Sequence, residues 1–567
     1  MAEGGATANL LPSPRPSMSV RLNIALLGHA STHEDFTYAF GLYRIQAYCL
    51  AAGLDQHNYR VFDRKSSDDE AQDLELLLAE QPDIVGLSAY LWNLPRVVRL
   101  VSALRQRRPE LLIVIGGPSA KGFDDLAIDD TRPDLLVVGF GELAFANIVR
   151  AVEAGELEQR IDQLGNVVHY PGKTGPGVQR SAPLEAQASL DDLPSPYLMG
   201  LVELATKTLY VETDRGCPYS CAFCIESTAS PKVTAFSMAR VEAELRWALE
   251  RKMEHIEMCS AIFNRDTEWL AAFVELVERL DPGGTLTFSG ALYSTYVDER
   301  QADLLSRLNL KSALFGLNST NPETFKSVRR VIRLEQFAKQ IGLLGGFLRP
   351  EVSLIMGLPG DTPEGFAKTL DFASSLEADV MIFRFMVLPN TLYYEQRDRY
   401  ELEIDFEHDN RILSTSSYSR EDFAQMEAIA AAAGFEQLSP GQWAKRRNEA
   451  VQAPEMARKL WNFAYLALRA LDLASMAWPD GWRFDRVVLE LRRYVQIKLL
   501  GPGDQQLEIF VFQRVDDVPH FAQSRFFNVA YRERGQRDEG SGARPVLERF
   551  VAALVGAERE LLGSRRR

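Results

Sequence analysis

The sequence is poor in cysteine, and the few cysteines that it has are unevenly placed. Only five occur in 567 residues, and three of them fall between Cys217 and Cys224. This spacing excludes the disulfide framework of a small secreted domain and favours a reducing cytoplasm. Long apolar runs are absent as well, since no stretch reaches the roughly 18 residues of a transmembrane helix. No membrane span is therefore expected.

Basic charge is also in short supply. Lys and Arg number 63 against 78 Asp and Glu, which gives a formal net charge of −15. A chain without a basic excess cannot offset many phosphates, so no nucleic-acid partner is expected. The N-terminus, MAEGGATANLLPSPRPSMSV, has no apolar stretch typical of a secretory signal. Its Pro, Ser, Ala and Gly content predicts a disordered tail over residues 1–20.

Apolar and charged residues are present in ordinary amounts, 46% and 25%, and the length predicts several domains. Residues 21–155 alternate buried strands with helical segments, and the strands are LNIALLGHA, PDIVGLSAYLW, LLIVIGGPSA and PDLLVVGFGE. This alternation predicts an α/β fold with a doubly wound, Rossmann-like parallel sheet that binds ligands at the carboxyl ends of its strands. No G-x-G-x-x-G follows a strand, which disfavours a simple NAD site.

A linker rich in Pro, Gly and Asp is expected over 156–205, and a second alternating series over 206–410. Six strand candidates in that series, most of them followed by a helix, predict a partial (β/α)6 barrel. Residues 411–567 are expected to form a mostly helical α+β domain with possible substrate contacts. Its predicted elements are helices over SREDFAQMEAIAAAAGF and APEMARKLWNFAYLALRALDLASMA and a strand over QLEIFVFQRV.

The segment RGCPYSCAFC holds three cysteines in the spacing C-x3-C-x2-C, with no fourth thiol nearby. Structural zinc favours two C-x2-C pairs, and a redox C-x-x-C would leave Cys217 without a role. Three thiolates in one loop suit an iron–sulfur cubane in which one iron stays free for a small chelating ligand.

This segment, at the end of the first strand of a (β/α)6 barrel, resembles the radical S-adenosylmethionine superfamily. The resemblance implies a [4Fe–4S] cluster on Cys217, Cys221 and Cys224, with S-adenosylmethionine on the free iron. It further implies that FGLNSTNPETFKSVRR contacts the ribose and carboxylate, that SLIMGLPGDTPEGF lies near the cofactor, and that an aromatic residue lies near the adenine. The cofactor-binding residues implied in this way are Phe223, Asn318, Ser319, Ser353 and Gly357.

One position departs from that family. An acidic or polar residue usually ends the second barrel strand and holds the methionine amino group. Here the run is CSAIFN, so Ser260 occupies the position of an Asp and Cys259 precedes it. Ser260 is taken as a cofactor contact. Cys259 is interpreted either as a small buried hydrophobe or as an unusual contact to the cluster or to S-adenosylmethionine.

A doubly wound domain ahead of such a barrel resembles the cobalamin-dependent branch of the superfamily. The resemblance implies cobalamin contacts from three turns, GGPSA, GFGE and SAYLWN. The contact residues are Gly116, Gly117, Ser119, Gly139, Gly141, Glu142, Tyr90 and Trp92. Trp92 has a core anchor as its alternative. The motif D-x-H-x-x-G, which supplies a histidine to cobalt, is missing, and His29 and His33 are expected to be surface or capping residues.

The resemblance implies a C-methyltransferase that moves a methyl group from S-adenosylmethionine, via methylcobalamin, to a carbon of a small natural-product precursor. An external one-electron reductant such as flavodoxin or ferredoxin is the implied partner. Tyr293 and Tyr296 of LYSTY are candidate catalytic residues that contact substrate, with barrel packing as the alternative. Ring contraction, oxidative cyclisation and a non-enzymatic iron–sulfur carrier or sensor remain alternative functions.

Overall fold

The structure of the chain is a computed structural model. It describes residues 20–30, 38–65, 67–122, 132–170, 179–182, 189–204, 206–226, 230, 232–406, 410–433, 478, 482–490, 494–500, 506–513, 522–523, 527–534 and 543–564.

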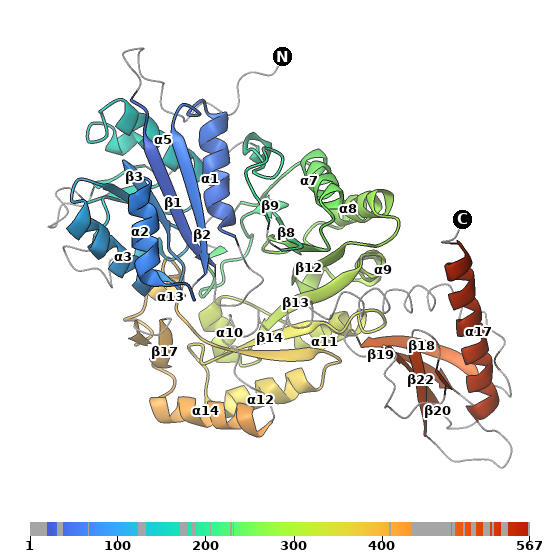
Figure 1. Ribbon diagram of the computed structural model, residues 1–567. Helices are drawn as coiled ribbons and strands as arrows, with labels where there is room; N and C mark the ends of the chain where they lie inside the picture. Colours follow the sequence, from blue (N-terminus) through green and yellow to red (C-terminus); the bar gives the residue numbers. More distant parts are fainter. Residues whose placement is uncertain are drawn as a thin grey trace.

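A seven-stranded sheet forms the N-terminal domain, drawn mainly in blue in Figure 1, with the strand order β2-β1-β3-β4-β5-β6-β7. The strands are β1 (Asn23–Ala30), β2 (Asn58–Lys65), β3 (Ile84–Ser88), β4 (Leu112–Gly116), β5 (Leu135–Val137), β6 (Val167–His169) and β7 (Gln179–Arg180). The first five pair in parallel, which confirms the predicted parallel sheet. The last two are antiparallel and extend the sheet from within the segment expected to be a linker.

Helices cover both faces of this sheet, as the buried pattern of its strands predicts. One core cluster contains α1 (Phe40–Ala51) and α5 (Glu142–Glu153), and a second contains α2 (Glu70–Ala79) and α3 (Leu94–Arg107). Strand β1 is buried along its whole interior because both layers pack on it. Short 3-10 turns follow at η1 (Ala120–Gly122), η3 (Ile161–Gln163) and η5 (Leu190–Asp192).

The second domain is a six-stranded, fully parallel sheet in the order β15-β14-β13-β12-β11-β8. Five of the six predicted strand segments contain the whole of one of its strands, and the sixth, SALFGLNST, overlaps a strand that begins two residues earlier, at Leu310. The strands are β8 (Thr208–Val211), β11 (His255–Met258), β12 (Thr287–Leu292), β13 (Leu310–Asn318), β14 (Glu351–Met356) and β15 (Asp379–Arg384). The connecting helices are α7 (Met238–Glu250), α8 (Thr267–Leu280), α9 (Glu299–Arg307), α10 (Pro322–Val328), α11 (Leu334–Gly342) and α12 (Pro363–Ser374).

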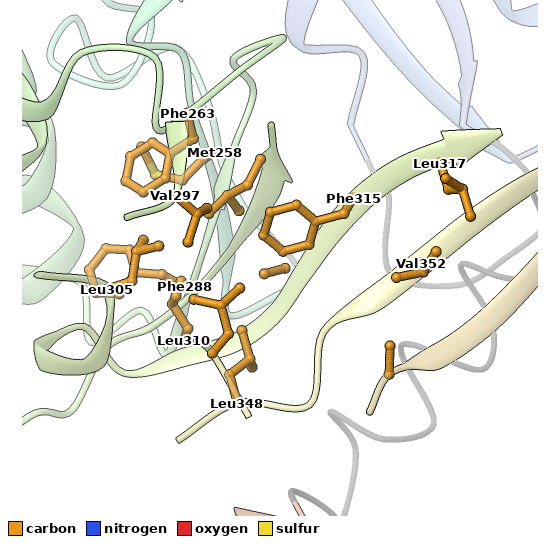
Figure 2. Close-up of a cluster of buried hydrophobic side chains, with 14 of the residues drawn as sticks. Met258, Phe263, Phe288, Val297, Leu305, Leu310, Phe315, Leu317, Leu348 and Val352 are labelled. Atoms are coloured by element: carbon orange, nitrogen blue, oxygen red, sulfur yellow. The ribbon is translucent and has the colours of Figure 1, made fainter. Parts of the chain in front are cut away.

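Helix starts in this domain are set by capping side chains. Ser237, Asp266, Asp298 and Thr362 each accept a hydrogen bond from a backbone N–H in the first turn of the helix that follows. These bonds satisfy donors that the helix itself leaves unpaired. The apolar faces of the helices then pack on the strands, and Figure 2 shows Phe288 and Phe315 among the side chains of that core. A rigid parallel sheet results, with its strand ends free to carry chemistry.

The C-terminal region contains further short elements and a second, antiparallel sheet. After β15 come α13 (Leu392–Glu395), the hairpin β16 (Glu403–Asp405) and β17 (Arg411–Ser414), and α14 (Arg420–Ala432). The sheet has the order β18-β19-β20-β22-β21, formed by β18 (Arg483–Glu490), β19 (Tyr494–Leu500), β20 (Gln506–Gln513), β21 (Ala522–Gln523) and β22 (Phe527–Arg534). Helix α17 (Ala543–Ser564) follows it.

The predictions for this region have mixed outcomes. Helix α14 lies in the first predicted helical segment, and β20 lies in the predicted strand. The sequence predicted that one strand where the structure has a sheet of five. The second predicted helix, over 453–477, lies outside the described residues. None of the helices in the described ranges is long and apolar enough to cross a bilayer.

Candidate active site

The three clustered cysteines lie in the loop that follows β8 and the short strand β9 (Asp214–Arg215). Cys217 and Cys221 are each 9% exposed, Cys224 is half-buried, and none forms a disulfide. The loop begins at Gly216, whose φ is +95°. A Cβ there would lie 2.5 Å from the Lys232 carbonyl oxygen, and β10 (Thr234–Ala235) follows at once. The close backbone approach therefore requires glycine.

Ala222, between the second and third cysteines of the loop, is hydrogen-bonded to two other barrel segments. The Ala222 N–H donates to the Val328 carbonyl oxygen at 3.0 Å, and the Ala222 carbonyl accepts from the Tyr393 N–H at 3.1 Å. Val328 ends α10 and Tyr393 lies in α13. The loop is thus fixed by backbone hydrogen bonds from the segments that follow β13 and β15.

The donor set of this loop fits an iron–sulfur cluster. Three thiols in one loop, none of them in a disulfide and with no fourth beside them, are what a cluster with one open iron requires. No group of three metal-binding side chains stands preassembled within the described residues. Binding a metal would therefore bring the thiols together, as is common when a site forms on loading. Burial raises the pKa of the Cys217 and Cys221 thiols, and nearby Arg330 acts in the opposite direction.

Tyr293 and Tyr296, the candidate substrate contacts, come together with two residues that the sequence did not single out. Tyr219, from the cysteine loop, stacks on Tyr293 with ring centroids 4.5 Å apart and planes 13° apart. The Arg330 guanidinium lies 4.6 Å from the Tyr293 ring centroid, so the two partners must cover opposite faces of that ring. The Tyr219 and Tyr296 hydroxyls hydrogen-bond at 3.1 Å. Tyr296 also contacts Tyr293, with ring centroids 5.9 Å apart, and both predicted residues are half-buried.

The residues expected to hold S-adenosylmethionine lie at the ends of neighbouring strands. Asn318 ends β13 with a left-handed φ of 66°, and Ser319 follows it, buried. The Asn318 side chain is 6% exposed and its Nδ2 has no hydrogen-bond partner among the described residues. A buried donor without a partner is costly unless a ligand accepts from it. This orphaned amide is an observation that fits a polar cofactor at this strand end.

The remaining predicted contacts to S-adenosylmethionine occupy three places. Ser353 is buried within β14, and Gly357 follows that strand with a φ of +86°. A Cβ on Gly357 would meet Phe423 at 2.7 Å, and the Tyr418 hydroxyl donates to the Gly357 carbonyl at 2.6 Å. Phe223 is half-buried and packs against the barrel core. These contacts make Gly357 a packed turn between β14 and the C-terminal region.

The sequence has no acidic residue at the end of the second barrel strand, but the structure brings the carboxylate of Asp214 there from the end of the first strand. Ser260 is buried and hydrogen-bonds the Thr213 hydroxyl, and both hydroxyls hydrogen-bond the Asp214 carboxylate. Burial raises the pKa of Asp214 to about 6, against the opposing effect of Arg265. Sequence reasoning missed Asp214 because it lies on the first strand end, and only the parallel pairing of β8 with β11 brings it to Ser260.

The structure bears on one of the two interpretations of Cys259. Its side chain is accessible to solvent, so it is not packed in the apolar core as a small hydrophobe, although burial by the surrounding protein raises the pKa of its thiol well above the ordinary value. Its thiol donates to the Glu257 carbonyl at 3.7 Å. A contact to a cofactor stays a prediction.

In the first domain, the GGPSA turn packs closely on the neighbouring strand end. The Ala89 N–H donates to the Gly116 carbonyl at 2.7 Å, and the Ser119 N–H donates to the Ala89 carbonyl at 3.0 Å. Gly117 has a φ of +101°, and a Cβ there would lie 2.6 Å from the Ala89 carbonyl oxygen. The turn requires glycine at 117, which leaves backbone exposed at the carboxyl end of β4.

Trp92 is not the core anchor that was its alternative, since it is 43% exposed. It stacks on Tyr90 with ring centroids 4.4 Å apart and planes 16° apart, and its Nε1 donates to the His29 carbonyl at 3.0 Å. The expectation of a surface or capping role for His29 is wrong, because His29 is buried and its Nε2 donates to Asp73 at 2.7 Å. Asn93 donates to its Nδ1 at 3.3 Å. Both ring nitrogens are thus occupied.

His33, the other histidine considered, lies outside the described residues. Gly139 follows β5 with a φ of +98°, and Gly141 is the N-cap residue of α5. Phe140 between them is 39% exposed. The GFGE turn therefore presents an apolar ring at the same strand-end edge as Trp92.

Glu142, the last residue of that turn, belongs to a buried charge network between the domains. Its carboxylate accepts from the Arg215 guanidinium at 2.6 Å, and Arg215 also donates to Glu212 at 2.7 Å. Arg44 of α1 pairs with the same Glu212 at 2.7 Å. Arg215 lies two residues before Cys217, and its guanidinium covers the Phe140 ring at 4.7 Å. The network ties the GFGE turn to the cysteine loop.

Two more contacts join the strand ends of the two sheets. The Tyr38 hydroxyl, just before α1, hydrogen-bonds the Tyr197 hydroxyl at 2.6 Å and accepts from the Tyr210 N–H of β8 at 2.9 Å. After β4, a Cβ on Gly122 would lie 2.6 Å from the Pro389 ring, which follows β15. These contacts place the carboxyl ends of the two sheets against one another, near α13 in Figure 1.

Two family models match separate parts of the chain. The family model described as a B12 binding domain matches residues 36–149, and the model described as the radical SAM superfamily matches residues 211–373. The first match covers β2 to β5, and the second begins at the end of β8 and includes the cysteine loop.

Two curated relatives are similar to about half of the chain. The 2-(S-pantetheinyl)-carbapenam-3-carboxylate methyltransferase of Streptantibioticus cattleyicolor is 28% identical over 336 residues, 54% of this chain and 47% of that protein. The cobalamin-dependent radical SAM methyltransferase TokK of Streptomyces tokunonensis is 27% identical over 337 residues, 55% of this chain and 48% of that protein. The chain thus spans about half the length of the curated relatives it matches.

Solved structures share the fold at low sequence identity. The radical S-adenosylmethionine methyltransferase TsrM of Kitasatospora setae, with tryptophan and a SAM analogue bound, aligns with a TM-score of 0.57 at 15% identity, covering 77% of this chain and 99% of that one. The cobalamin-dependent radical enzyme OxsB aligns with a TM-score of 0.56 at 14% identity, covering 81% and 74%. Both alignments extend over more than one domain of this chain.

Proposed function

We propose that this chain, which carries a B12 binding domain and a radical SAM domain, is a cobalamin-dependent radical S-adenosylmethionine methyltransferase. Its substrate would be a small natural-product precursor that is methylated on carbon. The observation that carries the proposal is the ion pair of Glu142 with Arg215, because it joins the turn beside the predicted corrin site to the cysteine loop. Two cofactors in two domains can act on one substrate only when their sites face one another.

The geometry supports a set of residues that would hold the cofactors. Cys217, Cys221 and Cys224 supply thiolates, and the Asn318 amide supplies a buried donor to S-adenosylmethionine. Asp214 offers the carboxylate that the second strand end lacks, and it would pair with the methionine ammonium. When bound, the cluster supplies one-electron chemistry and cobalamin supplies methyl-transfer chemistry.

In the first domain, Trp92 and Phe140 would contact the corrin. Both are large apolar side chains left exposed at the sheet edge that faces the barrel. Both ring nitrogens of His29 are hydrogen-bonded, one to Asp73 and the other to Asn93, so His29 would serve to position the loop that carries Trp92. A corrin held without a protein imidazole would fit the absence of D-x-H-x-x-G from the sequence.

The substrate would lie between the two sheets, against the tyrosines at the end of β12. The Tyr219 and Tyr296 hydroxyls share one hydrogen bond, so one of their two O–H protons stays available to an acceptor on the substrate. Tyr293 has both faces covered and would position its neighbours. The protein thereby orients the substrate and excludes water, while the reactive power belongs to the cofactors.

The partner and the setting follow from the same chemistry. A cluster that must accept one electron requires an external reductant such as flavodoxin or ferredoxin, which is part of the proposal. Thiols that ligate iron must stay reduced, and a reducing cytoplasm keeps them so. The substrate class is taken from the two curated relatives, whose names describe methyltransferases.

The proposal is tested by anaerobic purification, reconstitution with iron and sulfide, and addition of hydroxocobalamin, S-adenosylmethionine and a strong reductant. S-adenosylhomocysteine and 5′-deoxyadenosine are then followed by chromatography. The expected result is S-adenosylhomocysteine that depends on the corrin, together with 5′-deoxyadenosine that depends on the cluster. 5′-Deoxyadenosine without corrin-dependent S-adenosylhomocysteine would instead indicate the non-methylating chemistry. A protein that retains no corrin would contradict the assignment of the first domain.

A matched pair of variants controls the reconstitution. Cys221→Ala removes one proposed ligand, and Cys49→Ala removes a buried cysteine of α1 that has no proposed role. Iron bound per chain should fall in the first variant and stay at the wild-type level in the second. Equal iron content in the two would contradict the cluster site.

A further inference from the structure

We propose that the segment after α10 is the docking surface for the external reductant, and that this reductant is a small electron-carrier protein with an acidic surface. Three exposed residues form the docking surface, Arg329, Val331 and Arg333, and we call them the 329–333 strip. The inference rests on the proposed function, because only a cluster that accepts an electron needs such a partner. It adds the place where the partner binds and the charge that the partner carries.

The sequence around the strip is basic, although the chain as a whole is acidic. Residues 326–339 contain five Lys and Arg and one Glu, whereas the whole chain has 63 basic and 78 acidic residues. One of the five, Lys326, is paired with Glu323 at 2.6 Å. Arg329 and Arg333 are exposed, and neither forms an ion pair within the described part of the chain. Their charge is therefore left to act on molecules that approach this surface.

The backbone turns alternate residues of this segment outward. Arg329 ends α10 in a left-handed conformation with a φ of 60°, and no helix or strand follows before α11 begins. Arg330 and Ile332 are half-buried, because the Arg330 Nη2 donates to the Gly316 carbonyl at 2.7 Å and Ile332 packs against the barrel core. The strip residues on either side of them are exposed. Successive residues of an extended segment point in opposite directions, so the three strip residues share one face.

An apolar side chain lies between the two arginines of the strip. Val331 is 86% exposed, which makes it the most exposed large apolar side chain among the described residues. A single exposed valine needs no explanation. A valine with an exposed arginine on either side, however, has the composition of a protein interface, in which arginine is enriched and an apolar centre has a polar rim. The strip therefore suits a protein partner better than a small ion.

The strip begins directly after the residue that is bonded to the cysteine loop. The Val328 carbonyl accepts from the Ala222 N–H at 3.0 Å, and Ala222 lies between Cys221 and Cys224. Three residues of extended chain span at most about 11 Å, which bounds the distance from Val328 to Val331. A carrier on the strip would thus lie beside the loop that is proposed to hold the cluster. In the transfer the carrier loses one electron and the cluster gains it, and no covalent bond forms or breaks.

The charge of the strip favours an acidic carrier over a basic one. The chain has a formal net charge of −15, so its overall field repels an acidic protein. Arg329 and Arg333 form a local exception to that field beside the cysteine loop. Complementary charge at one place would bring an acidic carrier to the surface in one orientation and raise its association rate. A basic carrier would instead be drawn to the acidic remainder of the chain.

The test is the rate at which reduced bacterial flavodoxin, an acidic electron carrier, reduces the cluster of the reconstituted full-length protein. Anaerobic stopped-flow absorbance follows the reaction at low and at high salt. The wild-type rate constant should fall as salt is added, because salt screens charges at the surface. The double variant Arg329→Gln, Arg333→Gln should be about tenfold slower at low salt and should depend less on salt. Val331→Asp places a negative charge between the arginines and should slow the reaction as well.

A matched double variant, Arg246→Gln, Arg279→Gln, controls for net charge. It removes the same charge from two arginines of α7 and α8 that both pair with Glu242 and have side chains 54% and 59% exposed. Its rate should equal that of the wild type. Reduced methyl viologen is a small cation that needs no docking surface, so it counts the reducible clusters in each preparation. All flavodoxin rates are then compared per reducible cluster.

The outcomes separate the docking surface from the proposed function. Equal rates in the wild type and in the variant of both strip arginines would overturn the docking surface and leave the function standing. Equal slowing in the two double variants would do the same, as would a wild-type cluster that methyl viologen reduces and flavodoxin does not. A wild-type protein that assembles no cluster would overturn both.

Discussion

Replacing Glu142 with glutamine should weaken the contact between the two domains. Burial alone would raise the pKa of Glu142, but the Arg215 guanidinium outweighs that effect and holds the pKa below its ordinary value. Glu142 is therefore charged at neutral pH, and the variant leaves two arginines, Arg215 and Arg44, to share Glu212 alone. An uncompensated positive charge remains in a buried place.

The magnitude follows from the burial of the pair. The Glu142 and Arg215 side chains are 8% and 10% exposed, so water screens the interaction weakly. Removing one partner of a buried ion pair costs about 3–5 kcal/mol. Because Arg215 keeps its 2.7 Å bond to Glu212, and the amide oxygen of the Glu142→Gln variant can still accept a hydrogen bond, we expect a loss of about 2–3 kcal/mol.

The assay is urea unfolding followed by intrinsic fluorescence, with attention to the first transition because a multidomain chain need not unfold in one step. Glu70→Gln is the matched control, since the Arg99–Glu70 pair at 2.9 Å has side chains 61% and 38% exposed. That surface pair should contribute less than about 1 kcal/mol. Because the folded-state pKa of Glu142 is depressed, its contribution should also fade as the pH falls below the ordinary range of glutamate. Equal losses in the two variants at neutral pH would refute the reasoning.

Three further predictions concern the cofactor sites. Asp214→Asn should lower the affinity for S-adenosylmethionine about tenfold or more. Calorimetry should also show the affinity of the wild type falling as the pH drops through about 6, because the Asp214 carboxyl takes up a proton there. An affinity of the wild type that does not change with pH would contradict the ammonium contact. Asn318→Gly keeps the left-handed backbone conformation and removes the unpartnered side-chain amide. It should therefore weaken S-adenosylmethionine binding by about 1 kcal/mol and barely change the melting temperature. Unchanged binding would contradict the contact between Asn318 and S-adenosylmethionine. Gly117→Ala should destabilise the first domain and impair corrin retention. The control is Gly53→Ala, which is also at positive φ but has nothing within 4 Å of the added Cβ, so it should lose only about 1 kcal/mol of stability through left-handed strain. Equal melting temperatures of the two variants would show that the Gly117 turn tolerates a side chain.

Much of the fold could be predicted because its signals are local. Buried strands followed by amphipathic helices specify parallel sheets; five of the six barrel strands lie wholly in the predicted segments, and β13 begins two residues before its segment. The cysteine spacing is local too. Three strands of the first sheet were missed. β2 lies at the sheet edge and has no buried residue, so its sequence lacks the apolar run of the other strands. β6 and β7 have only three and two residues, too few to carry a period, and they extend the sheet by pairing on β5 and on each other.

The parts of the site that escaped prediction depend on contacts between distant segments. Asp214 reaches Ser260 through the pairing of two strands, and Arg330, just after α10, reaches the Tyr293 ring after β12. Glu142 was expected to contact the corrin, whereas its carboxylate is committed to Arg215 in the other domain. A sequence motif names such residues at best, and their partners become visible only in three dimensions.

The central claim is that the carboxyl ends of the two sheets bring a corrin and an iron–sulfur cluster to one substrate. The most direct measurement is electron paramagnetic resonance of the protein loaded with both, with cobalt as Co(II) and the cluster reduced. The account predicts that the two signals broaden or split each other, because the two centres would lie on either side of the interface held by Glu142 and Arg215. Two signals identical to those of the singly loaded protein would contradict it.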